Sequence, residues 1–193
     1  MPAQPPLVII GRTGKATRLR GRLSSNVRPH LNTLAVIAGL FGGAAIALYV
    51  VILRRLGPLR PNIVRLQLTF SERSFRRVLT SWGEAGVGRF QSHFALDYAF
   101  LACYAAFGVA AGSWLVAHAT VPSLGHAVLP WLWPAAAVFD AVENKLHKAL
   151  TGAEPGSLPP APFLAAGIAA TAKWLLLVGA ILVAGFAWLS RAA

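Results

Sequence analysis

Ionisable side chains stand inside stretches of this chain that are otherwise apolar enough to cross a membrane: Asp97, Asp140, Glu143 and Lys173. Such groups cost several kcal/mol in hydrocarbon unless they are paired or hydrated, so they usually face the interior of a helix bundle. Carboxyl groups beside an amine can form ion pairs, relay protons or act as acid and base on a bound substrate. The sequence therefore predicts a charged cluster inside a membrane protein.

The acidic part of the cluster follows helical spacing. Asp140, Glu143 and Asn144 are three and one residues apart, with Ala136 before them and His147 after them at the spacing of one helix face. The opposite face carries apolar side chains. We therefore expect this stripe to point into a bundle.

Two further apolar stretches contribute the other residues of the predicted cluster. Asp97 and Tyr104 are seven residues apart and share a face of one helix. Lys173 lies about ten residues into the last apolar stretch, roughly 15 Å along a helix axis. In antiparallel neighbouring helices these groups reach a similar depth, so an intramembrane polar cluster is predicted, made of Asp97, Tyr104, Asp140, Glu143, Asn144 and Lys173.

Four interpretations of the cluster compete. It can be a network of ion pairs that holds helices in register, with Lys173 pairing Glu143 or Asp97. It can serve proton or small-solute translocation. It can belong to an enzyme that acts on a lipid, with a carboxylate as acid or base and Lys173 stabilising a developing charge. A metal or haem site of Asp140, Glu143 and His147 is the fourth, but the paired Glu-x-x-His motifs of bundle di-iron sites are missing. We expect no metal and no cofactor.

The composition supports a membrane location. The chain has 193 residues, 56% hydrophobic and 12% charged, whereas soluble domains carry about 25% charged residues. Its net charge is +12, and the basic residues flank apolar segments. Basic residues beside membrane spans bind anionic lipid headgroups, and no nucleic-acid-binding motif is present. We therefore expect a lipid surface as partner and no nucleic acid.

Four apolar stretches have the length of about 20 residues that a membrane-spanning helix needs. They cover residues 33–53, 94–119, 128–150 and 163–189. Gly39 and Gly43 in the first stretch, like Gly108 and Gly112 in the second, have the small-xxx-small spacing of close helix contacts. We predict an all-α integral membrane fold in which four transmembrane helices form one domain over residues 32–193.

The segment 71–82 predicts an additional amphipathic helix that lies in the membrane interface. Ser71 can cap its start, and apolar residues recur at helical spacing up to Trp82, with arginines on the other face. We expect lipid-headgroup contacts from Arg54, Arg55, Arg73, Arg76 and Arg77.

The two sides of the membrane are predicted from the basic residues. Residues 1–31 are basic and free of acidic residues, which indicates a disordered tail on lipid headgroups or a leader peptide. The segment 54–92 has more cations than the opposite side and is assigned to the cytoplasm. The inner or plasma membrane of a bacterium is expected rather than an organelle membrane.

The residues from Leu66 to Lys173 resemble small multi-pass membrane proteins without an assigned activity. The likeness rests on Trp82-Gly83, Asp97-Tyr98, Asp140-x-x-Glu143-Asn144 and Lys173. It implies an architecture and no chemistry.

From the sequence we expect a non-catalytic subunit or assembly factor of a larger membrane complex, in which the charged cluster fixes helix packing. Its protein partners would be other membrane subunits or a second copy of the chain. The alternative is a small proton-linked transporter, or an intramembrane lipid-modifying enzyme that uses the same cluster. The residues leave open whether the protein is an enzyme.

Overall fold

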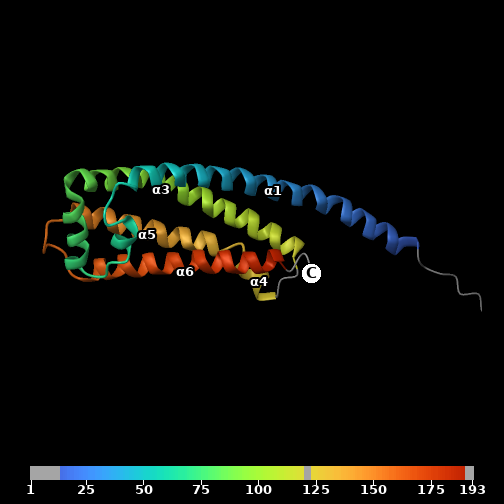
Figure 1. The fold of residues 1–193 in the computed structure, drawn as a ribbon. Helices are drawn as coiled ribbons and strands as arrows, with labels where there is room; N and C mark the ends of the chain where they lie inside the picture. The colour runs from blue at the N-terminus through green and yellow to red at the C-terminus, as the bar shows by residue number, and fades with distance from the viewer. Residues whose placement is uncertain (1–13, 120–122, 190–193) are drawn as a thin grey trace, which may run out of the picture.

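The computed structural model describes residues 14–119 and 123–189, and this part of the chain is helical without any strand. The helices are α1 (Gly14–Leu56), α2 (Ile63–Gln67), α3 (Glu72–His118), α4 (Ser123–Val128), α5 (Leu132–Gly152) and α6 (Ala161–Leu189). In Figure 1, α1, α5, α6 and most of α3 run along one long axis. The structure is therefore an elongated helical bundle.

Three of these helices are long and apolar enough to cross a membrane: α1 over Thr33–Leu56, α3 and α6. This supports a membrane protein. The helix α5, over which we predicted a further span, does not meet that criterion. Its 21 residues include Asp140, Glu143, Lys145 and Lys148, and this charge lowers its mean hydropathy.

The first helix begins earlier than the sequence indicated. Residues 14–31, predicted as part of a disordered tail or leader, belong to α1. Figure 1 shows this part of α1 projecting past the other helices. The rest of the predicted tail, residues 1–13, lies outside the described residues.

A glycine divides α3 into two parts. Gly83 has φ 63° and ψ −179°, a conformation that L side chains rarely adopt. We call residues 72–82 the cap segment. It crosses one end of the bundle (Figure 1, green) before the chain turns into the long part of α3. Ser71 caps its start as predicted, by accepting a hydrogen bond from the Ser74 N–H.

The apolar face of the cap segment packs on protein. Phe75 is 1% exposed and its ring lies 5.7 Å from that of Phe163 on α6. The indole N–H of Trp82 donates to the Pro61 carbonyl at 2.6 Å. We had expected this face to point toward lipid, and that expectation is corrected. Its rings cover the end of the bundle because α6 and the 57–62 turn meet there.

The arginines predicted to contact headgroups divide into two groups. Arg55 donates to the Ser92 carbonyl at 2.9 Å, and Arg76 donates to the Ala153 carbonyl at 2.7 Å. These two side chains therefore tie segments of the protein together. Arg76 is half-buried and Arg55 is exposed despite its hydrogen bond, while Arg54, Arg73 and Arg77 are exposed as well.

The two predicted glycine faces have different surroundings. A Cβ on Gly108 would lie 2.2 Å from Cβ of Trp133, and one on Gly112 would lie 2.7 Å from Cα of Pro130. The close contact predicted for this pair is confirmed. A Cβ on Gly39 or Gly43 meets nothing within 4 Å among the described residues, so that pair makes no such contact here.

Candidate functional site

The predicted polar cluster has Lys173 at its centre. The Lys173 ammonium on α6 lies 2.9 Å from Asp140 Oδ1 and 2.6 Å from Glu143 Oε2, both on α5. The phenol of Tyr104 on α3 donates to Asp140 Oδ2 at 3.4 Å. All of these side chains are buried, and Glu143 is 0% exposed. The network joins three helices at one depth, because residues three apart on α5 face the same point of α6.

Asp97 occupies a separate position beside this network. The Asn144 side-chain amide donates to Asp97 Oδ2, which links α5 to α3. Lys173 forms its ion pairs with Asp140 and Glu143 and not with Asp97. Of the two pairings that we had considered for the lysine, the structure therefore has the one with Glu143 and adds Asp140.

The acidic stripe continues to His147, toward the cap segment. His147 Nδ1 lies 3.4 Å from Glu143 Oε1, and its ring stacks on Phe75 at 5.7 Å between centroids. Its other ring nitrogen, Nε2, has no hydrogen-bond partner within the described part of the chain. Over residues 14–119 and 123–189, no three His, Cys, Asp or Glu side chains are grouped to hold a metal ion.

A cavity of about 650 Å³ borders the polar network. Most of its wall is apolar and comes from α1, α3 and α6, with α2 at one end. Side chains that line it include Ile46, Tyr49, Leu53, Phe100, Leu177 and Val178. Its size is in the range of small-molecule sites, about 300–1,000 Å³, which are mostly apolar with a few placed polar groups.

A few polar side chains also line the cavity. Asp97, Asp140 and Lys173 from the network line it, together with His93 and Gln67. Gln67 is 8% exposed, and its Oε1 has no hydrogen-bond partner among the residues that the structure describes. His93 is 2% exposed and pairs with the Phe90 carbonyl through Nδ1.

Sequence reasoning did not find Gln67. We predicted no helix or strand for residues 62–70, but the structure places Gln67 at the end of α2, inside the bundle. A polar residue between Leu66 and Leu68 has no periodic signal, so only the fold brings it to the cavity.

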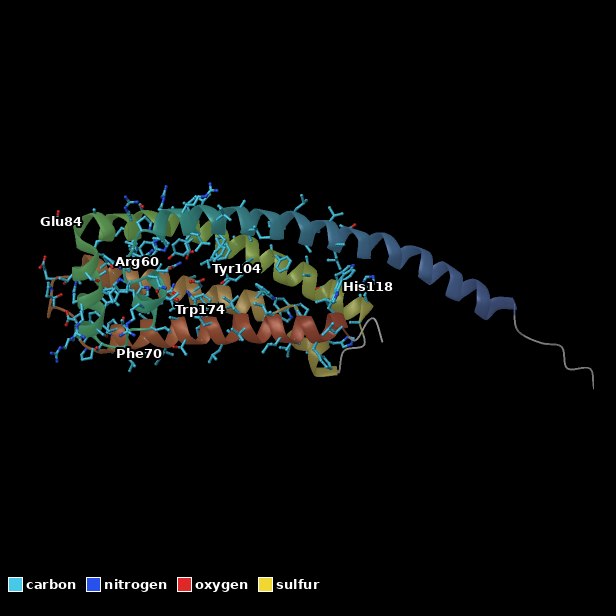
Figure 2. The ribbon with its side chains drawn as sticks, in the orientation of Figure 1. Arg60, Phe70, Glu84, Tyr104, His118 and Trp174 are labelled. Carbon is cyan, nitrogen blue, oxygen red and sulfur yellow. The ribbon has the colours of Figure 1, made fainter. Side chains whose placement is uncertain are left out.

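Apolar side chains of both α1 and α6 that line the cavity are exposed, including Ile46 (68% exposed) and Ile181 (59% exposed). This exposure indicates that the cavity opens between α1 and α6. Figure 2 labels Tyr104 and Trp174, which line the cavity in the middle of the bundle. An amphipathic molecule could lie there with its apolar part between α1 and α6 and its polar part at the network.

No protein-family model, curated protein or solved structure matches the chain. The function is therefore argued from the geometry of the site.

Proposed function

We propose that this chain is an integral membrane protein with four spans that binds one amphipathic, lipid-like molecule inside the bilayer. The observation that carries the proposal is the cavity of about 650 Å³, which is apolar over most of its wall and is also lined by the Asp97, Asp140 and Lys173 side chains.

The outer face of α5 supports a fourth span. Asp140 and Glu143 are buried against α6, whereas Val138 and Val142 are 63% and 46% exposed. An amphipathic helix with its charges inward and its valines outward suits a bundle surrounded by lipid. The two lysines of α5, Lys145 and Lys148, are exposed toward the end of the helix, where long side chains reach the interface.

The cap segment then lies at the interface on the side of the basic residues. Arg54, Arg73 and Arg77 are exposed there and suit contacts with anionic headgroups. This side carries more cations than the opposite one, which supports a cytoplasmic location in a bacterial inner or plasma membrane. The cap segment differs from a free interfacial helix in that its aromatic residues pack on the bundle.

An occupant from the lipid phase fits the opening. The rim residues Ile46 and Ile181 are apolar and exposed on helices that have the composition of membrane spans. A chain-like apolar molecule can therefore enter between α1 and α6 without crossing water. Polar groups at the inner end would orient it, as the few polar groups in a ligand site do.

The ion pairs of Lys173 favour a binding function over a catalytic one. The Lys173 ammonium already has two carboxylate partners, at 2.6 and 2.9 Å, so it is not a free group for stabilising a developing charge. The same pairing supports the structural part of our first expectation, a network that fixes helix packing. The role as a subunit or assembly factor stays a prediction.

The test blocks the cavity mouth and follows labelling by a photoreactive lipid. Purified protein in vesicles would be exposed to hexadecanol with a diazirine in its chain, and labelled peptides would be mapped by mass spectrometry. We expect labels on cavity-lining segments of α1 and α6. The double substitution Ile46→Trp with Ile181→Trp should remove most of them, because the indoles fill the mouth.

A matched control places the same side chains elsewhere on the same helices. Leu40 and Ile168 are 68% and 54% exposed and do not line the cavity. Leu40→Trp with Ile168→Trp should leave the labelling unchanged. Uniform labelling of all exposed helix faces, or equal behaviour of the two double variants, would refute the proposed site.

A further inference from the structure

The polar end of the cavity contains more negative than positive groups. Asp97, Asp140 and Lys173 line the cavity, and Lys173 also pairs with the buried Glu143 behind the wall. Asp140 and Glu143 share that lysine, whereas within the described part of the chain Asp97 has only the neutral amide of Asn144 as its side-chain partner. The part of the wall that Asp97 contributes therefore has a carboxylate without a cation.

A second acceptor belongs to the wall of the same cavity. Gln67 is more than nine-tenths buried and lines the cavity, and within residues 14–119 and 123–189 its Oε1 has no hydrogen-bond partner. A buried acceptor that is left without a hydrogen bond costs about 1–3 kcal/mol of stability. A bound molecule that donates a hydrogen bond to this oxygen would remove that cost.

The nearby cations do not supply the missing charge. Lys173 is held by its two carboxylates, and the Arg55 guanidinium donates to the Ser92 carbonyl. Arg65 is exposed at the end of the short helix α2. No other Lys or Arg side chain among the described residues lines the cavity.

We infer that the molecule bound in the cavity is a long-chain amine, whose protonated head group lies between Asp97 and Gln67 and whose hydrocarbon chain extends between α1 and α6. This inference rests on the proposed function and specifies the class of ligand. An ammonium head supplies a positive charge for the Asp97 carboxylate. It also supplies an N–H donor for the Gln67 Oε1.

Other head groups fit this wall less well. A carboxylate or phosphate would bring another negative charge next to Asp97 and Asp140, and like charges at short range repel strongly in a medium of low dielectric. A hydroxyl could donate to Gln67 but would leave Asp97 without a cation. Burial of a charged head is tolerated where it is paired and hydrogen-bonded.

The experiment compares head groups on one chain length. Hexadecylamine, hexadecanol and hexadecanoate would each compete with the photoreactive alcohol, at equal mole fraction in vesicles near neutral pH. We expect the amine to compete best and the carboxylate least. If the three compete equally, or the carboxylate wins, the amine assignment fails while the lipid site stands. If none competes, the proposed function fails with it.

Two substitutions test where the head group lies. Asp97→Asn keeps a partner for Asn144 but removes the charge, so the preference for amine over alcohol should fall about tenfold, as for loss of a charged hydrogen bond. Gln67→Leu should reduce the affinity for the amine as well. Glu84 is an exposed carboxylate at the end of the bundle (Figure 2), so Glu84→Gln should leave the preference unchanged.

The outcome of these variants decides the assignment. A preference that survives Asp97→Asn in protein that melts at the wild-type temperature would overturn it. A preference that falls equally in Glu84→Gln would show that surface charge attracts the amine, and would also overturn it.

Discussion

The helix α6 has two contrasting neighbours. Toward α5 it forms a closed seam, in which Lys173 meets Asp140 and Glu143 and small side chains such as Ala170 are fully buried. Toward α1 it forms an open seam, where the cavity separates the two helices. The comparison shows that charge and small residues join the helices on one face, while large apolar side chains on the other face border a cavity.

The closed seam should depend most on its lysine. Lys173→Met would leave Asp140 and Glu143 buried without a cation, and breaking a buried ion pair in this way costs about 3–5 kcal/mol. We expect a large drop in the thermal midpoint of purified protein in mild detergent, followed by circular dichroism. An unchanged midpoint would show that the closed seam does not rely on this charge.

A compensating variant sharpens that result. Because the lysine pairs with two carboxylates, replacing only one of them leaves the other unpaired. Lys173→Met combined with Asp140→Asn and Glu143→Gln should be more stable than Lys173→Met alone, since no charge remains buried and unpaired. A triple variant as unstable as the single one would argue that the lysine acts through its packing.

The contact of α3 with α5 should be the next most sensitive. Gly108→Ala would place a Cβ 2.2 Å from Cβ of Trp133, and overpacking of this kind costs about 1–3 kcal/mol. The matched control is Gly43→Ala on α1, where a Cβ meets nothing within 4 Å. That variant should be as stable as the wild type or slightly more so, because Ala favours helix over Gly. Equal effects in the same melting experiment would contradict the described contact.

A smaller loss of stability is expected when the hydroxyl of Tyr104 is removed, since this residue lines the cavity and contacts Asp140 at the closed seam. Tyr104→Phe removes a long hydrogen bond to Asp140, at 3.4 Å, and a typical loss is about 1 kcal/mol. Urea or thermal unfolding in detergent measures it. A loss as large as that of Lys173→Met would mean that the phenol, and not the ammonium, carries the network.

Substitutions at the open seam should change the stability least. Val178 is 52% exposed and lines the cavity, so Val178→Ala should change the stability by no more than about 0.5 kcal/mol. The same substitution should weaken lipid labelling of α6, because it removes part of the apolar wall. Marked destabilisation would show that α1 and α6 support each other directly across the cavity.

The closed seam was largely predictable from the sequence, and the open seam was not. The stripe from Asp140 to His147 follows helical periodicity, and Lys173 stands alone in an apolar helix, so their meeting required only an antiparallel arrangement. The sequence did not decide whether Lys173 pairs with Glu143 or with Asp97, because a rotation of α6 by a fraction of a turn determines which carboxylate the ammonium reaches. Periodicity does not determine such a rotation.

The cavity depends on how separate segments are placed. The turn at residues 57–62 and the short helix α2 bring Gln67 into the bundle, and this route is set by tertiary contacts. The cap segment also shows what helical spacing cannot predict. Its apolar spacing predicted a helix whose rings face lipid, yet the end of the bundle offers a protein surface for Phe75 and Trp82. Spacing gives the apolar face of a helix but does not identify what covers it.

The lateral position of the cavity mouth has a consequence for measurement. If the proposed ligand enters between α1 and α6, it comes from the hydrocarbon phase and not from water, because both helices have the composition of membrane spans. Occupancy should then follow the mole fraction of the ligand among the lipids, and it should stay constant when more buffer is added at a fixed lipid composition. Dilution of the same membranes with unlabelled lipid should empty the site.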